Sequence, residues 1–275
     1  MPVRVTCVRL FVSVAVAALL AAGLAGCQTT GSAETTGSIA APSARSDAEW
    51  RNDAQRLAEK FRANPKDPDN AIRYAQALRA TGQRAQAAAV LETAALHNPR
   101  NRAVLGAYGR ALADTGSFKQ ALDVLERAHT PDQPDWRILS VQGAVMDQMG
   151  RHAEAQRYYA SALKIMPDEP SVLSNLGLSY ALSKDLRRAE ETLRRAAAHG
   201  GADRRVRQNL ALVVGLQGRF PEAESIARAE LPPDEAAANV AYLKQMLAQK
   251  GNANFKKAIG SRTVQGLEPA DESGS

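Results

Sequence analysis

Aromatic residues are scarce in this sequence. Phe, Trp and Tyr together make up 5% of its 275 residues, whereas Ala and Leu are abundant and long stretches lack clusters of β-branched residues. Helices favour Ala and Leu, while strands favour aromatic and β-branched side chains. The composition therefore predicts an all-α fold whose helices pack through small residues.

Only two cysteines are present, Cys7 and Cys27. We expect Cys7 to leave with an N-terminal signal segment, so the mature chain would keep one thiol and form no internal disulfide. A chain of this length can bury a substantial core without disulfides or metals. We therefore expect packing to stabilise the fold.

Long apolar runs and clustered charge are also missing beyond residue 30. No later segment is apolar enough to span a bilayer. The formal net charge is only +6, and charges alternate in sign along expected helices, as in Arg187, Arg188, Glu190 and Glu191. This pattern is typical of solvated helix faces, and it lacks the basic stripe with aromatics that nucleic acids require. We expect no nucleic-acid partner.

Catalytic motifs are absent as well. The sequence contains no nucleophile elbow and no glycine-rich phosphate loop, and its four histidines have no cysteine or carboxylate at metal-ligand spacing. We therefore expect a non-enzymatic protein with no catalytic residue, metal, cofactor or small-molecule substrate.

The N-terminus has the pattern of a signal peptide over residues 1–26. Arg4 and Arg9 precede an apolar run at 10–22, and small residues lead to Cys27. The ending Leu24-Ala25-Gly26-Cys27 resembles the bacterial lipobox, which implies acylation of Cys27 and a durable membrane anchor. The alternative is an ordinary secretory signal with an incidental cysteine.

Residues 27–46 predict a lipidated cysteine followed by a disordered tether of Ser, Thr, Gly, Ala and Pro. Such a tether has a root-mean-square span of about 25 Å. By resemblance to enterobacterial lipoproteins, Gln28 implies the outer membrane, with the body on its periplasmic face. We expect residues 251–275 to form a flexible tail.

A period of 34 residues organises the rest of the chain. One repeat position is always alanine: Ala87, Ala121, Ala155, Ala189 and Ala223. A second position is glycine in four repeats, at Gly82, Gly116, Gly150 and Gly218, and lysine in one, at Lys184. Alanine allows close helix crossing, and glycine permits the positive φ angle of a helix C-terminal cap. The pattern resembles the tetratricopeptide repeat, in which stacked helical hairpins share one core.

This resemblance predicts a solenoid of about five helical hairpins between two capping helices. The repeats are expected over residues 68–101, 102–135, 136–169, 170–203 and 204–233. The capping helices are expected over 47–67 and 234–250. In the fifth repeat Arg207 replaces an apolar residue and Glu230 an alanine, as if the array were ending.

The first helices of such hairpins line the partner-binding groove in the repeat family. The residues expected there are Arg73, Gln76, Arg110, Asp147, Asn175 and Asn209. Asn175 and Asn209 share one repeat position, where an amide could both donate to and accept from a ligand backbone. The alternative is that they are ordinary polar residues facing solvent. Four leucines are expected to make the later groove more apolar: Leu178, Leu182, Leu212 and Leu216.

The end of the array carries a more particular resemblance. Residues 209–220 (NLALVVGLQGRF) and 229–247 (AELPPDEAAANVAYLKQML) resemble the C-terminal region of the TadD family, the repeat lipoproteins of tight-adherence (Flp) pilus assembly. The resemblance implies an outer-membrane assembly factor that binds pilus-assembly proteins and serves the pilus secretin as a pilotin-like partner.

Two other functions stay open on the sequence. A generic repeat lipoprotein could organise cell-wall or export machinery on the periplasmic side, or the chain could be a regulatory subunit of a periplasmic enzyme.

Replacing Cys27 with Ser removes the thiol that acylation requires. The repeats should stay folded, because residue 27 precedes the first expected helix, but the protein should no longer sediment with the outer membrane. Membrane fractionation and circular dichroism measure the two effects. An unacylated variant that still sediments with that membrane would show that the lipid anchor is wrongly inferred.

Overall fold

The computed structural model describes residues 45–200 and 202–248. The expected signal peptide, Cys27, nearly all of the tether and the expected tail lie outside these residues. The described part is all-α, as predicted, with twelve helices and no strand. None of these helices is both long and apolar enough to cross a membrane.

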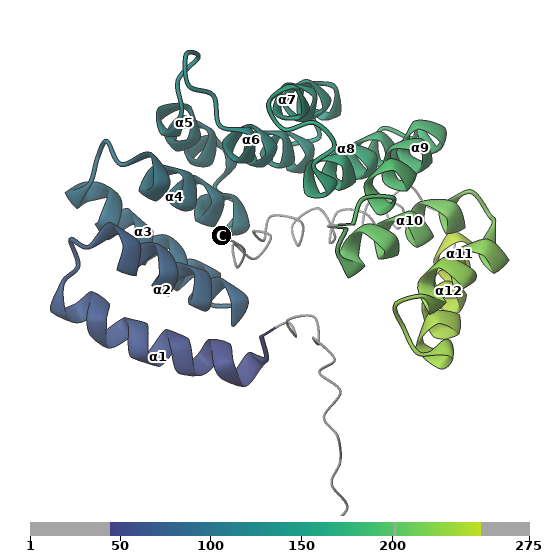
Figure 1. Cartoon of the computed structure of the whole chain (residues 1–275), viewed down its shortest axis with the longest axis horizontal. Helices are drawn as coiled ribbons and strands as arrows, with labels where there is room; N and C mark the ends of the chain where they lie inside the picture. The colour runs from purple at the N-terminus through teal and green to yellow at the C-terminus, as the bar shows by residue number, and fades with distance from the viewer. Residues whose placement is uncertain (1–44, 201, 249–275) are drawn as a thin grey trace, which may run out of the picture. The chain divides into compact units, whose positions relative to one another are not determined.

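The helices follow one another as a leading helix, five hairpins and a closing helix (Figure 1). The leading helix is α1 (Asp47–Ala63) and the closing helix is α12 (Pro233–Ala248). The hairpins are α2 (Pro68–Ala80) with α3 (Arg84–His97), α4 (Arg102–Asp114) with α5 (Phe118–Ala128), α6 (Trp136–Gln148) with α7 (His152–Ile165), α8 (Pro170–Leu182) with α9 (Leu186–Ala197), and α10 (Arg204–Leu216) with α11 (Phe220–Arg228).

The first helix of every hairpin begins at a capping side chain. These caps are 34 residues apart: Asp67, Asn101, Asp135, Glu169 and Asp203. Each accepts a hydrogen bond from a backbone N–H of the first turn, which would otherwise have no partner inside the helix. The second helices α3, α5, α7 and α11 begin without such a cap.

A tight turn joins the two helices of each hairpin. Gly82, Gly116, Gly150 and Gly218 take φ angles of 78°, 82°, 77° and 82° there. In the fourth hairpin Lys184 takes the same left-handed conformation at φ 68°. In every hairpin the next N–H bonds back to a carbonyl five residues earlier, as in Gln83 N to Leu78 O at 2.8 Å. The period of glycines therefore predicted the turn correctly.

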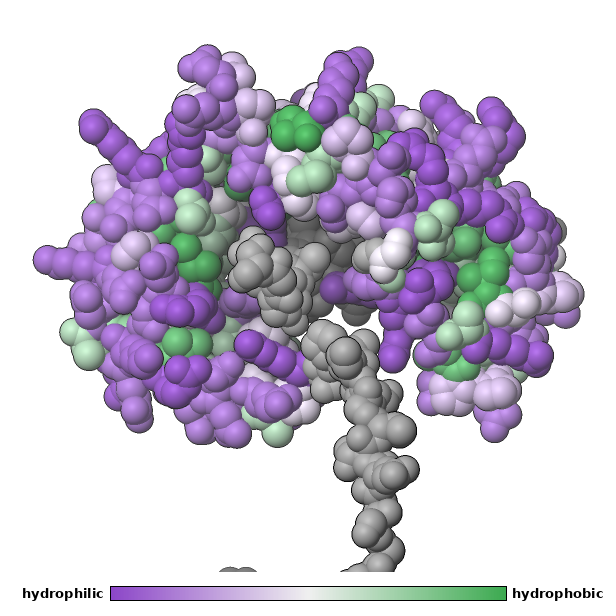
Figure 2. Space-filling view, viewed as in Figure 1, coloured by the Kyte–Doolittle hydropathy of each residue, from purple (hydrophilic) through white to green (hydrophobic). Residues whose placement is uncertain are grey.

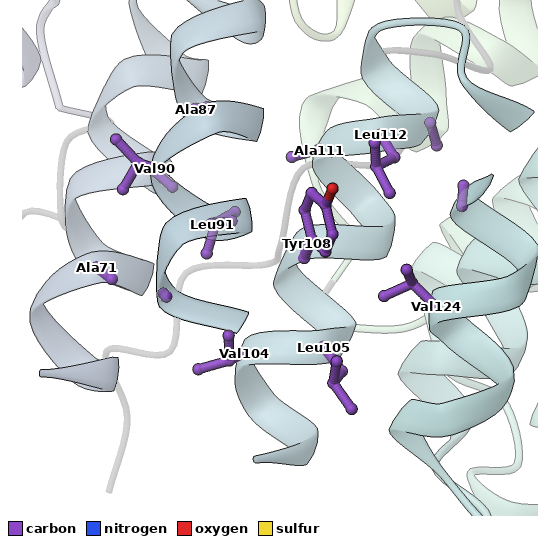
Figure 3. Packing of buried hydrophobic residues seen from close by; sticks show 14 of the residues in the cluster. Ala71, Ala87, Val90, Leu91, Val104, Leu105, Tyr108, Ala111, Leu112 and Val124 are labelled. Atoms are coloured by element: carbon purple, nitrogen blue, oxygen red, sulfur yellow. The ribbon is translucent and has the colours of Figure 1, made fainter. Parts of the chain in front are cut away.

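Close approach of the two helices in a hairpin depends on small residues. A Cβ added to Gly109 would lie 2.5 Å from Leu125. One added to Gly143 would lie 2.7 Å from the ring of Tyr159, and one added to Gly177 would lie 2.6 Å from Leu193. The core continues between successive hairpins, where Figure 3 shows side chains such as Leu91, Tyr108 and Val124 among the helices.

The last hairpin differs from the others through a pair of charges. The Arg207 guanidinium donates to the Glu230 carboxylate, and Arg204 lies 3.9 Å from the same carboxylate. The two departures from the repeat pattern in this hairpin therefore compensate each other. Beyond them α12 packs on α10 and α11, where Ala236 and Leu243 are buried.

Replacing Gly143 with Ala should lower stability. Alanine is favoured over glycine inside a helix by about 1 kcal/mol. The new methyl group would nevertheless press against Tyr159, which is fully buried and hydrogen-bonded, and such overpacking costs about 1–3 kcal/mol.

Thermal unfolding of Gly143→Ala should therefore show a lower melting temperature than the parent. Gly200→Ala is the matched control, because no atom lies within 4 Å of its added Cβ and its φ is not positive. Equal melting temperatures for both variants would mean that the glycine is not required for packing.

Candidate partner-binding surface

The first helices of the hairpins form a continuous series that we call the inner row: α2, α4, α6, α8 and α10. Each helix of this row contacts the next one as well as its own hairpin partner. Polar and charged side chains cover most of the face seen in Figure 2, with small apolar patches between them. The inner row carries all six predicted groove residues.

Asn175 and Asn209 are buried, each at most 7% exposed. The Asn175 amide donates to Ser140 Oγ at 3.3 Å, and the Asn209 amide donates to Ser174 Oγ at 3.0 Å. Each asparagine therefore links its helix to the preceding helix of the inner row. One N–H donor of each amide is thus bound to a serine, whereas the sequence analysis expected both amides to face a ligand.

Asp147 is also buried and serves as an acceptor for three side chains. Ser179 Oγ donates to its Oδ1 at 2.8 Å, Tyr159 OH donates to its Oδ2 at 3.1 Å, and His152 Nδ1 lies 2.9 Å from Oδ1. Burial raises the pKa of Asp147, while the hydrogen bonds from His152, Ser179 and Tyr159 oppose the increase. Asp147 therefore joins α6, α7 and α8 rather than facing a groove.

Arg110 lies among charged groups of three inner-row helices. Arg79 of α2, Asp114 of α4 and Arg137 of α6 are close enough to act on its charge. Its Nε is buried and has no hydrogen-bond partner. Burial, followed by the repulsion of Arg79, lowers the pKa of Arg110 to about 10, so the side chain remains charged at neutral pH.

The carboxylate nearest to Arg110 along its helix is already engaged. Arg79 Nε donates to Asp114 Oδ2, and only 11% of the Arg79 side chain and 4% of the Asp114 side chain are exposed. Asp135 caps α6 by accepting from the backbone N of Arg137 at 2.7 Å.

The remaining predicted residues lie on α2, where Arg73 is exposed and Gln76 is half-buried. Of the four leucines expected in an apolar groove, Leu178 and Leu212 are instead buried in the core, whereas Leu182 and Leu216 are half-buried. The structure thus brings the predicted residues onto one row of helices but buries half of the six. Their role in partner binding stays a prediction.

Two polar features escaped the sequence analysis although the sequence held a signal for them. Ser140 and Ser174 share one repeat position, and Asn175 and Asn209 share the next, so the same bond forms twice between residues 35 apart. A second feature is a closed ring of ion pairs among Glu190, Arg194, Glu222 and Arg219 on α9, α11 and the turn before it. The ring's members are 28 or 29 residues apart across the two hairpins.

No group of His, Cys, Asp or Glu among the described residues is arranged to hold a metal ion.

Comparisons with known proteins identify this architecture. A sequence profile described as "Tetratricopeptide repeat" matches residues 148–213, and one described as "Anaphase-promoting complex, cyclosome, subunit 3" matches residues 51–128. No curated protein sequence matches the chain. The described residues have the tetratricopeptide-repeat fold, and the repeat profile itself covers about a quarter of the chain. The predicted fold class is confirmed.

Solved structures show the same fold at low sequence identity. "PilW, widely conserved type IV pilus biogenesis factor" is 17% identical, with a TM-score of 0.57 over 70% of this chain and 91% of that one. "APC/C hetero-tetramer Cut9-Hcn1" is 13% identical, with a TM-score of 0.58 over 80% of this chain and 45% of that one. At these identities the likeness is one of fold. The tetratricopeptide-repeat array is a scaffold for protein interactions.

Replacing Asp147 with Ala should destabilise the array. Tyr159 OH and Ser179 Oγ would lose their acceptor in a buried site, and each unsatisfied group costs about 1–3 kcal/mol. Asp147→Asn is the matched variant, because it keeps one oxygen acceptor and has no charge.

The pH dependence tests the raised pKa of Asp147. A carboxyl whose pKa is raised by folding stabilises the protein fully below its unfolded pKa and loses that contribution as pH rises through the folded value. Asp147→Asn should therefore gain stability relative to the parent as pH rises from about 3 to 7. Urea unfolding across that range measures the difference; a difference independent of pH would contradict the raised pKa.

Proposed function

We propose that this chain is a lipid-anchored protein-binding scaffold of tight-adherence (Flp) pilus assembly. In this proposal an acylated Cys27 holds it at the periplasmic face of the outer membrane, and the repeat array engages pilus-assembly proteins. It assists the outer-membrane secretin in the manner of a pilotin.

The observation that carries the proposal is the resemblance of residues 209–220 and 229–247 to the TadD family. In the structure these segments cover most of α10, the turn to α11, and the greater part of α12. Asn209 donates to Ser174, and Leu243 contributes to the core that closes the array. The resembling segments therefore lie at the C-terminal end of the array, where α12 follows the last hairpin and the 34-residue pattern no longer applies.

The division between anchor and array supports a role as an adaptor. The helices of the array lie between Asp47 and Ala248, and the expected acylation site, Cys27, precedes them in the chain. A protein anchored at Cys27 can therefore keep its inner row available without using it for membrane attachment. PilW, a similar fold at 17% identity, is itself described as a pilus biogenesis factor.

Crosslinking in living cells tests this function. The tagged chain would be crosslinked, solubilised in detergent, captured and analysed by mass spectrometry. Recovery of a secretin together with other pilus-assembly proteins is the expected result. Enrichment of cell-wall enzymes or of an unrelated exporter would replace the pilus assignment with a general envelope scaffold, and one stoichiometric catalytic chain would indicate a regulatory subunit.

The matched control is the same capture with the Cys27→Ser variant. Its array should stay folded but lose contact with partners that reside in the outer membrane. Equal recovery of the secretin from both proteins would contradict delivery by the lipid anchor.

A further inference from the structure

The array begins with α1 and ends with α12, and these two helices present different side chains to solvent (Figure 1). The outward face of α1 is polar, with Asn52, Arg56 and Glu59 all exposed. A polar outer face suits the end of a solenoid, because no further repeat stacks on it. In α12, however, the large side chain of Tyr242 is 61% exposed. The C-terminal end of the array therefore exposes an aromatic group that a polar cap would lack.

Tyr242 lies at a repeat position through which earlier hairpins contact the next hairpin. Ser140 and Ser174 precede it by three and two periods of 34 residues. Each accepts a hydrogen bond from an asparagine of the following inner helix, at 3.3 and 3.0 Å. Gly106 has the same position one period earlier and lies against Ile138 of the following inner helix. No further hairpin follows α12 within the described residues, so the corresponding face of α12 is open.

Exposed residues at alternating spacings of four and three form a stripe along this face of α12. They are Asp234, Ala238, Ala241, Gln245 and Ala248. Leu243, on the opposite side of the helix, is buried in the core of the array. Spacings of four and three are those of the seam between two packed helices, and alanine lets the second helix approach closely. We call this stripe, together with Glu235 and Tyr242 beside it, the terminal face.

We propose that the terminal face is the interface of a symmetric dimer, in which α12 packs antiparallel against α12 of a second copy of the chain. A twofold axis brings the same residues of both copies together, so the assembly closes after two copies. The occupant of the terminal face is thus the chain itself. The dimer does not depend on the proposed function, because no pilus protein takes part in the contact.

The polar groups at the two ends of the stripe complement each other in an antiparallel pair. When Ala238 of one helix lies opposite Ala241 of the other, the same register brings Asp234 opposite Gln245. The Gln245 amide can then donate to the Asp234 carboxylate, and the twofold axis makes this contact twice. A parallel pair would instead place each Asp234 beside its counterpart, and such like-charge contacts oppose association.

The flank of the terminal face adds a second complementary contact. Glu235 and Tyr242 are exposed on one side of the stripe, and the twofold axis brings Glu235 of one copy beside Tyr242 of the other. The Tyr242 hydroxyl can donate to the Glu235 carboxylate while its ring packs over the alanines of the stripe. Head-to-tail stacking on α1 offers neither contact, because Arg56 and Glu59 would cover the aromatic ring with charge.

Native mass spectrometry of the full chain released from detergent micelles measures the association. The dimer fraction should rise with protein concentration, because a helix of 16 residues, about 24 Å long, buries too little surface for a permanent dimer. Tyr242→Ala should weaken the dimer at least tenfold. Its melting temperature should match that of the parent, because the exposed ring contributes little to the core.

An exchange of two residues of the stripe tests the register. Gln245→Glu places a second carboxylate opposite Asp234 and should weaken the dimer at least tenfold. The double variant Asp234→Gln, Gln245→Glu again pairs an amide with a carboxylate, so its association should lie within threefold of the parent. Gln55→Glu makes the same change at an exposed position of α1 and should alter association less than twofold.

A chain that stays monomeric at every concentration overturns the dimer, and so does a double variant that associates no better than Gln245→Glu. Two further results would give the terminal face to another occupant. If association appears only in a chain that ends at Ala248, residues 249–275 occupy the face. If Tyr242→Ala keeps the dimer but loses a protein captured in crosslinked cells, the face binds that protein instead.

Discussion

The short distance between the two helices of each hairpin is the constraint on which the rest of the structure depends. At Gly109, Gly143 and Gly177 the opposing side chain occupies the space where a Cβ would lie. Because these helices approach so closely, the hairpins can share one core. The alanines that recur every 34 residues in the second helices, from Ala87 to Ala223, are completely buried. The inner row exists because each hairpin presents its first helix at the same spacing.

Polar bonds between hairpins then fix how the inner helices meet. Apolar packing tolerates small shifts, whereas a buried amide or carboxylate requires its partner at one distance. Asn175 with Ser140 and Asn209 with Ser174 repeat one such bond, and Asp147 joins three helices at once. Other buried polar atoms of the inner row have no hydrogen-bond partner, among them Arg110 Nε and Gln142 Oε1.

The sequence predicted the helices, the turns and the order of hairpins because these depend on local patterns. The glycines at a positive φ angle and the alanines of the second helices recur in register. The burial of each polar side chain could not be predicted in the same way. Whether Asn175 faces a ligand or a serine depends on a side chain 35 residues away, and helical periodicity within one element carries no information about that contact. Likewise Arg207 and Glu230 looked like two separate departures from the repeat until the structure showed them paired.

The residues that cap the N-termini of the five inner helices limit the direction from which a charged partner can approach. Since the caps occupy one repeat position, the N-termini of all five inner helices gather along one edge of the array, where their partial positive charges would attract anions. Four of the five caps are carboxylates, and each already occupies a first-turn N–H that an anion would seek. An acidic ligand is thus repelled from that edge, although helix N-termini would otherwise attract it.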